Sequence, residues 1–209
     1  MESADQLASF ANAIAAGEVV VVPLEHSYAY ACDAFNQSAV ARMHELRGAA
    51  VGTAAQVLIS SIDTLAGVAH FVPDEMQQLA KRFWPGELTL QVAPNSFLNW
   101  DLGDAGSLGE FAVRVPKSDF VLALLGKTGP LAIASLSSVG KPALGKIPST
   151  LDSKISLVQD VGELPFGEPS TVVRMKVIGT DSGLEVLRVG AITLAQLREV
   201  LPEISQATL

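Results

Sequence analysis

The chain has 209 residues, of which 49% are hydrophobic and only 17% are charged. This composition excludes intrinsic disorder as the main state, and a chain of this length buries about 70% of its unfolded surface in one core. Its 14 Lys and Arg against 22 Asp and Glu give a formal net charge of −8. Such a balance argues against broad, non-specific binding of nucleic acid, although an acidic body can still hold a small basic cleft. The apolar runs are too short for a membrane span and the N-terminus is acidic, so we expect a cytoplasmic protein without a membrane partner.

Hydrophobic periodicity and capping signals predict helices and strands along the whole chain. Ser3 with Gln6 has the spacing of a helix capping box, and Thr193 with its glutamine three residues later repeats it. Further helices are expected after Asn36, Pro73 and Ser118, and strands at residues 19–22, 56–60, 88–92, 111–115, 131–134, 171–177 and 184–189. The first of these strands is an uninterrupted β-branched run and is expected inside the sheet.

Two stretches lack periodicity. Residues 95–109 are polar and rich in glycine, which predicts an exposed loop, and residues 140–169 are rich in proline and glycine, which predicts a mobile flap. Residues 179–183, Gly-Thr-Asp-Ser-Gly, predict the turn of a late hairpin. Helices and strands alternate before it and no linker interrupts them. The sequence therefore predicts a single α/β domain (of the α+β type) over residues 1–209, with a twisted mixed sheet and flanking helices.

Several reactive residue types lack the pattern of a site. The one cysteine, Cys32, has no partner for a disulfide or a zinc site and is expected to be a buried packing residue. The three histidines lack the spacing of metal ligands. Neither Gly126-Lys127 nor Gly140-Lys141 is preceded by the glycine that a P-loop requires. We therefore predict no protein-bound metal and no P-loop.

Polar residues stand where several predicted strands begin or end. They are Glu25, His26, Tyr28, Ser135, Ser137 and Ser170. Ligands of open α/β sheets usually lie outside strand ends, where hydroxyls and free backbone N–H groups can hold a carboxylate or a phosphate. Serines also cap turns in the same places, and spacing alone does not choose between the two roles.

Two arginines lie inside apolar strands. Arg114 belongs to Ala-Val-Arg-Val-Pro and Arg188 to Val-Leu-Arg-Val-Gly. A buried guanidinium without an anion is costly, so each is expected to meet a carboxylate or a bound phosphate. The two together predict either one shared anion site or two separate structural ion pairs.

The order of motifs resembles that of a known family. The motifs are Pro23-x-Glu25-x-x-Tyr28, Cys32-Asp-Ala-Phe-Asn36, Glu45-Leu-Arg-Gly48, Trp84-Pro-Gly-Glu-Leu-Thr89, Ala112-Val-Arg-Val-Pro116, Ser135-x-Ser137, Ser170-Thr-Val-Val173 and Leu187-Arg-x-Gly-Ala191. In this order they resemble the YrdC/TsaC/YciO family over about residues 17–191.

The resemblance implies a twisted mixed sheet around a concave, locally basic cleft. Family enzymes of the TsaC type join L-threonine, bicarbonate and ATP into threonylcarbamoyl-AMP, and a partner complex transfers the threonylcarbamoyl group to adenosine 37 of tRNA. Other members are described as double-stranded RNA-binding proteins or translation factors. ATP would be a substrate that brings its own Mg²⁺, because the chemistry needs positioning and anion stabilisation more than a protein nucleophile.

The resemblance also implies site residues. Arg188 and Ser137 would contact the nucleotide, Ser135 and Ser170 would hold threonine or phosphate, and Arg114 would bind an anionic group. Four further positions of the matching motifs complete the nucleotide- and threonine-binding set: Glu25, His26, Tyr28 and Arg47.

Several positions depart from the family pattern. Leu24 and His26 replace two threonines, Ala49 replaces the second cation of Lys-x-Arg, and Ser137 replaces the asparagine of Ser-x-Asn. Each lost charge-assisted contact weakens binding by about 1.5–3 kcal/mol. Three functions therefore remain open: the synthase, a non-catalytic paralogue that binds nucleotide or double-stranded RNA, and a related enzyme for another amino acid.

Overall fold

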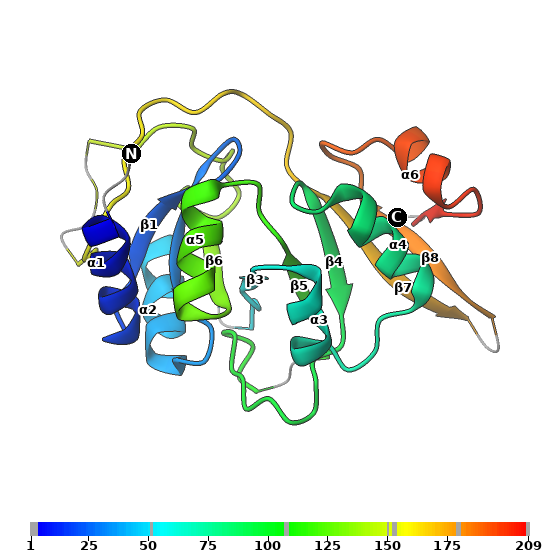
Figure 1. Ribbon diagram of the computed structural model, residues 1–209, viewed down its shortest axis with the longest axis horizontal. Coiled ribbons are helices and arrows are strands. Elements are labelled where there is room, and N and C mark those ends of the chain that lie inside the picture. The colour runs from blue at the N-terminus through cyan, green and yellow to red at the C-terminus, as the bar shows by residue number, and fades with distance from the viewer. Residues whose placement is uncertain are drawn as a thin grey trace.

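A nine-stranded mixed β-sheet forms the centre of the computed structural model, which describes residues 4–50, 52–106, 109–149, 151, 154–178 and 181–207 (Figure 1). The helices are α1 (Ala4–Ala15), α2 (Gln37–Arg47), α3 (Ile62–Val68), α4 (Asp74–Phe83), α5 (Asp119–Thr128) and α6 (Leu194–Val200). The strands are β1 (Val20–Pro23), β2 (Tyr28–Asp33), β3 (Gln56–Leu58), β4 (Leu88–Val92), β5 (Phe111–Arg114), β6 (Leu131–Ser135), β7 (Thr171–Ile178), β8 (Asp181–Arg188) and β9 (Ser205–Gln206).

The strands pair in the order β1-β2-β6-β3-β5-β4-β7-β8-β9. The pairs β3–β5, β4–β7 and β8–β9 are parallel and the other neighbours are antiparallel, so the predicted mixed sheet is confirmed. The hairpin of β7 and β8 is confirmed as far as the pair Ile178 and Asp181, while residues 179 and 180 of its predicted turn lie outside the described residues.

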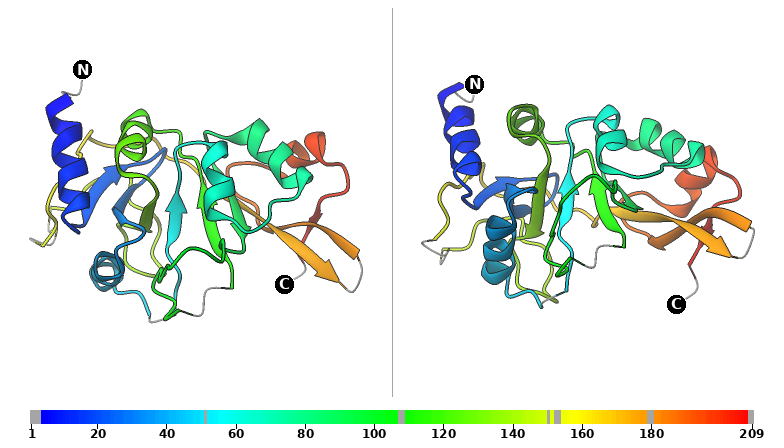
Figure 2. Two further views of the ribbon diagram at one scale, coloured as in Figure 1. Left: turned by 60° about the horizontal axis from the view of Figure 1, so that its bottom comes forward. Right: turned by 90° about the horizontal axis from the view of Figure 1, so that it is seen from below.

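Alternating side chains of the sheet build two apolar cores. Val20 and Val22 of β1 pack with Phe10 of α1 and Phe120 of α5, whose rings meet edge to face at 5.1 Å. Val21 belongs to the larger core, which includes residues of α2 and α4. Helices α1 and α5 thus cover one face of the first strands and α2 covers the other (Figure 2). This period of two is what a strand buried on both faces requires.

The prediction that residues 19–22 form an interior strand is wrong in its topology. Strand β1 is the first of the sheet, yet all four of its residues are buried. Its outer edge is covered by residues 156–159, since the Val21 N–H donates to the Leu157 carbonyl at 2.9 Å and the Gln159 N–H donates to the Val21 carbonyl at 2.9 Å. An edge strand that is covered in this way is shielded from water, so its sequence can be as apolar as that of an interior strand.

Residues 140–169 form an irregular strap, of which residues 150, 152 and 153 lie outside the described part. The strap passes the α1 side of the molecule and crosses to β7 (Figure 1). The Tyr28 N–H donates to the Leu144 carbonyl at 2.8 Å, and the Leu164 N–H donates to the Gly145 carbonyl at 2.8 Å. Backbone hydrogen bonds thus fasten the segment that was predicted to be a mobile flap at several points, and its mobility stays a prediction.

The caps and ends that the sequence predicts for the helices are only partly observed. The capping box of Thr193 and Gln196 is present at α6, whereas Ser3 lies outside the described residues. Ser118 stands at the N-cap of α5 without a capping bond, because its hydroxyl donates to the Pro23 carbonyl at 3.0 Å. The glycine at position 126 predicts the end of that helix, but the helix continues to its C-cap at Gly129.

The loop at residues 95–109 is less exposed than predicted. Phe97 is 93% exposed, but Trp100 and Leu102 are buried, and Trp100 packs edge to face on Phe111 at 5.1 Å. Large apolar side chains in a polar stretch thus enter the core. Among the described residues, no helix combines the length and the apolar character that crossing a bilayer requires.

Replacing Asn36 with alanine tests the cap of α2. The Asn36 side chain accepts a hydrogen bond from the Ala39 N–H at 3.0 Å. We expect Asn36→Ala to lower the free energy of unfolding by about 1 kcal/mol, because it leaves that N–H without its partner. Urea denaturation measures the change, and Ser38→Ala at an exposed position of the same helix is the control. Equal stability of the two variants would contradict the cap.

Candidate functional site

A buried ion pair joins the loop after β1 to the end of β5. The Arg114 side chain donates from both terminal nitrogens to Glu25, with Nη1–Oε1 at 3.1 Å and Nη2–Oε2 at 2.9 Å. The side chains are only 6% and 9% exposed. Nη1 also donates to the Gly86 carbonyl at 3.3 Å, while Nε is buried without a partner among the described residues. A planar two-point contact of this kind fixes orientation as well as charge.

The protonation of Glu25 is set by the same contacts. Burial by itself raises the pKa of the Glu25 carboxyl, but the charge of Arg114 and the Lys117 N–H, which donates to Oε1 at 2.6 Å, outweigh it and lower that pKa below its usual value. Glu25 is therefore a carboxylate at neutral pH and compensates the charge of Arg114.

A second carboxyl, Glu87, lies beside this pair. Its Oε2 is 3.2 Å from Nε2 of His26, and its side chain is 14% exposed. Burial and the negative charge of Glu25 raise the pKa of Glu87, against the opposite effects of His26 and Arg114. The two carboxyl groups near Arg114 therefore differ in their shifts, because the pKa of Glu25 is lowered and that of Glu87 is raised.

Arg188 completes the cluster from β8. Its Nε and Nη2 donate to the Ser170 carbonyl at 3.1 and 2.8 Å, and Nη2 reaches the Ser170 hydroxyl at 3.2 Å. Loss of solvation and the positive charge of Arg114 lower the pKa of Arg188, so the two guanidinium groups interact electrostatically. Contrary to expectation Arg188 is exposed, and no described carboxylate forms an ion pair with it.

We call Glu25, His26, Glu87, Arg114, Ser170 and Arg188 the arginine–glutamate cluster. The structure thus answers the question left open by the two arginines in apolar strands. They are electrostatic neighbours, but Arg114 has its own carboxylate and Arg188 does not. The cluster combines two guanidinium groups with two carboxyl groups, so its charges are mixed.

A chain of polar side chains leads into the cluster from the sheet. The Gln56 amide donates to the Thr89 hydroxyl at 2.9 Å, and Thr89 donates to the Ser170 hydroxyl at 2.9 Å. Ser170 therefore accepts bonds from Thr89 and Arg188, and its own hydrogen remains to be donated.

Sequence reasoning missed Glu87, Thr89 and Gln56 as site residues. A signal existed for two of them, because Glu87 and Thr89 belong to the quoted Trp-Pro-Gly-Glu-Leu-Thr motif. Their contact with Ser170 follows from the parallel pairing of β4 with β7, in which Leu88 lies opposite Thr171. This pairing joins segments that are about 80 residues apart, and local periodicity does not contain it.

The remaining predicted residues have other partners. The hydroxyls of Ser135 and Ser137 are 2.8 Å apart, and Ser137 also donates to the Lys141 carbonyl at 3.4 Å. The Tyr28 hydroxyl donates to the Gly162 carbonyl at 2.7 Å and so holds the strap. Arg47 ends α2, and its Nε is buried without a partner among the described residues. No contact that the structure describes links Arg47 to the cluster.

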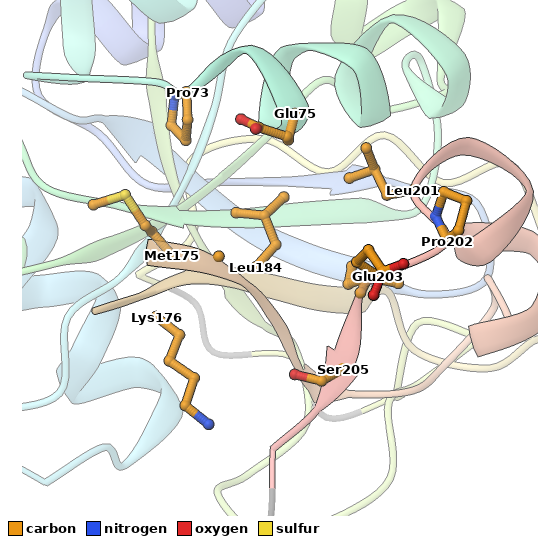
Figure 3. A pocket seen from close by; sticks show the side chains of 11 residues that line it. Pro73, Glu75, Met175, Lys176, Leu184, Leu201, Pro202, Glu203 and Ser205 are labelled. Atoms are coloured by element: carbon orange, nitrogen blue, oxygen red, sulfur yellow. The ribbon is translucent and has the colours of Figure 1, made fainter. Parts of the chain in front are cut away.

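Two large hollows lie away from the cluster. One of about 540 Å³ is lined by Glu75, Met175, Leu184 and residues 201–205 (Figure 3). Another of about 720 Å³ shares Glu75 and Met175 and extends along α3 to Phe71. Neither is lined by a residue of the cluster, so the size of a hollow does not identify the site. What marks the cluster as the candidate site is its buried ion pair and its groups with shifted pKa values.

Reactive groups elsewhere are few in the described part of the chain. Cys32 is buried as predicted, and burial raises its thiol pKa to about 12, which leaves it a packing residue. His44 is buried with Nε2 2.9 Å from the Leu102 carbonyl. Among the described residues, no group of three or more His, Cys, Asp or Glu side chains could hold a metal ion.

Fold and cluster together define a class: an α/β domain with a mixed sheet that gathers two arginines, two glutamates and a serine at strand ends. The chain belongs to the Sua5/YciO/YrdC family. The sequence profile of that family, which carries the description "telomere recombination", matches residues 12–190. The resemblance inferred from the motifs and the α/β fold class are both confirmed.

Individual relatives support this placement. A threonylcarbamoyl-AMP synthase of Bacillus subtilis is 32% identical over 200 residues, which are 94% of this chain and 56% of the synthase. The structure of Pyrococcus abyssi Sua5 complexed with L-threonine matches with a TM-score of 0.86 and 30% identity, covering 97% of this chain and 59% of that one. Escherichia coli YciO shares the fold at a TM-score of 0.72 and 22% identity, with 89% of both chains covered. The chain thus spans less than two thirds of the Bacillus and Pyrococcus proteins.

Replacing Glu25 with glutamine tests the buried ion pair. We expect Glu25→Gln to lower the free energy of unfolding at pH 7 by about 3 kcal/mol, because it leaves a buried guanidinium without its counter-charge. The lowered pKa of Glu25 means that its stabilisation is present above the ordinary Glu pKa and is lost as the pH falls through the folded-state pKa. The difference from wild type should therefore shrink below about pH 4.

The matched control is Glu18→Gln. Glu18 pairs with Arg42 at 3.1 Å, but those side chains are 37–38% exposed, so the loss should stay below about 1 kcal/mol. Denaturant titrations at pH 7 and in acid measure both variants. Equal losses for Glu25→Gln and Glu18→Gln would contradict a structural role of the buried pair.

Proposed function

We propose that this protein is a threonylcarbamoyl-AMP synthase, which joins L-threonine, bicarbonate and ATP. The observation that carries the proposal is Arg188, a guanidinium held by Ser170 with no described carboxylate to neutralise it. An exposed cation backed by a rigid strand end is suited to bind a phosphate. Membership of the family and 32% identity with the Bacillus subtilis synthase supply the particular reaction.

The proposed reaction requires no nucleophile from the protein. The threonine amine and bicarbonate form a carbamate and release water. A carbamate oxygen then attacks the α-phosphorus of ATP, and pyrophosphate leaves. The protein's contribution is to position the substrates and to stabilise negative charge, which matches a cluster of Arg and Ser side chains and the buried, unreactive Cys32.

Named residues take distinct parts in this proposal. Arg188 donates to a phosphate of ATP, and Ser170 donates its remaining hydrogen to the same group or to threonine. Arg114, which is compensated by Glu25, holds the loop of Glu25 in place. Ser135 and Ser137 supply hydroxyls at the end of β6.

Mg²⁺ would enter with ATP. The described residues offer no ready-made cage of carboxylates and imidazoles for a metal. Mg²⁺ commonly binds through substrate phosphates and water, so ATP would bring its own ion. Transfer of the product to tRNA would be the work of partner proteins.

Specific observations favour a second candidate, a non-catalytic or altered-specificity paralogue that binds nucleotide or double-stranded RNA. Ala49 lacks the second family cation, and the Ser137 hydroxyl is already bonded to Ser135 and the Lys141 carbonyl. His26 and Leu24 also reshape the loop and could select another amino acid.

Pyrophosphate release tests the synthase. Purified protein should release pyrophosphate only when threonine, bicarbonate and ATP are all present, and mass spectrometry should detect threonylcarbamoyl-AMP. We expect Arg188→Ala to lower kcat/KM by about 100-fold or more, since it removes a charged contact to the reacting phosphates. Arg198→Ala, at an exposed position of α6, is the matched control and should change little.

The alternatives have their own outcomes. Wild-type protein that binds ATP or RNA by calorimetry but releases no pyrophosphate would support the paralogue. Pyrophosphate exchange with an amino acid other than threonine would support altered specificity. Loss of activity in Arg198→Ala equal to that in Arg188→Ala would contradict the assigned role of Arg188.

A further inference from the structure

His26 lies between two oxygen atoms that normally accept hydrogen bonds. Its Nδ1 is 3.2 Å from the Pro165 carbonyl oxygen, and its Nε2 is 3.2 Å from Oε2 of Glu87. Pro165 belongs to the end of the strap, and Glu87 directly precedes β4. The imidazole therefore bridges the strap and the sheet at the cluster.

The two contacts require one proton more than a neutral histidine beside an ionised glutamate provides. A neutral imidazole has a single N–H, so either the carbonyl or the carboxylate would face a lone pair. Both contacts are satisfied when the pair holds an extra proton, as imidazolium with carboxylate or as neutral imidazole with a carboxylic acid. The pair is then a shared-proton site.

The surroundings favour retention of that proton. Glu25 of the same loop acts on Glu87 with negative charge, and Arg114 of β5 acts on it with positive charge. Arg188 of β8 interacts electrostatically with Arg114, and the strap itself carries two exposed glutamates, Glu163 and Glu168. The net effect, dominated by burial, raises the pKa of Glu87, so burial and the geometry point in one direction.

The strap lies directly against the imidazole ring of His26. A methyl group built on Gly167 would overlap three atoms of the His26 imidazole. The backbone at Gly167 therefore passes closer to the ring than any larger residue allows. Three residues further along is Ser170, whose carbonyl and hydroxyl hold Arg188.

We propose that the His26–Glu87 pair is a protonated latch that fastens the end of the strap, residues 163–169, and thereby positions Ser170 and Arg188. His26 acts through these residues and is a positioning residue. The latch is closed while the pair holds its extra proton and opens as rising pH removes it. Its effect on turnover rests on the proposed function, whereas the latch itself does not.

Hydrogen exchange measures the latch without activity. The reporter is the Leu164 N–H, bonded to the Gly145 carbonyl within the strap, with protection corrected for the intrinsic exchange rate at each pH. In the wild-type full chain, we expect protection to fall about tenfold between pH 6 and pH 9, the value of one lost charge-assisted hydrogen bond. The sign follows because a proton held by the folded state stabilises it at low pH and is lost as the pH rises.

Two variants separate the latch from other causes. Glu87→Gln supplies a permanent N–H to Nε2 of neutral His26, whose Nδ1–H still reaches Pro165, so protection should remain high at both pH values. His26→Ala removes both contacts and should give low protection at both. His70→Ala, at an exposed histidine outside the cluster, should behave as wild type.

Clear results would overturn the latch. It fails if His26→Ala keeps wild-type protection, or if Glu87→Gln keeps the pH dependence of wild type. Should His26→Ala not fold, Gly167→Ala, which pushes the strap from the ring, must show reduced protection instead.

Activity adds an independent readout. In an active enzyme, the wild-type KM for ATP should rise between pH 6 and pH 9, while Glu87→Gln should show a flatter profile. Absence of turnover in wild type would count against the synthase and leave the exchange result untouched. Exchange that ignores the variants would count against the latch and leave the synthase untouched.

Discussion

The structure of the candidate site depends on the buried contact between Arg114 and Glu25. This contact ties the loop after β1 to β5, although the two residues are 89 positions apart in the chain. Because both charges are removed from water, neither can be kept without the other. The pair fixes the loop that carries His26, and its guanidinium acts on Arg188 and Glu87 through space. Burial is the main cause of the pKa shifts of Glu87 and Arg188, and the charges of this ion pair modify both.

Because Arg114 has a carboxylate partner and Arg188 does not, the two arginines have different roles. A guanidinium that already has a carboxylate partner can organise its neighbours, but it offers little net charge to a ligand. Arg188, bonded only to neutral oxygens of Ser170 in the described part of the chain, keeps its charge available. Sequence reasoning treated the arginines as equivalent because both lie in apolar strands. Their difference depends on which one meets Glu25.

The sequence was a good guide to local structure and a poorer guide to partners. The cap at Asn36 and the capping box at Thr193 rest on neighbouring residues, and both features are present. The strand β2, the short helix α3 and the two-residue β9 carry weak local signals and were not predicted. Gln56 lies outside the quoted motifs. Glu87 and Thr89 stand inside one, but the parallel pairing of β4 with β7, which brings Thr89 to Ser170, is not contained in local periodicity.

The strand order also has a consequence for how the chain reaches its native state. Strand β6 lies between β2 and β3, and β7 joins β4 only after the strap has spanned the molecule. Half of the described pairings, namely β2–β6, β6–β3, β3–β5 and β4–β7, join strands that are not consecutive in the chain, so each of these ladders requires a long loop to close. Topologies of this kind fold slowly compared with helical bundles of equal stability. The β1–β2 and β7–β8 pairs are local by comparison, and each can form before the rest of the sheet.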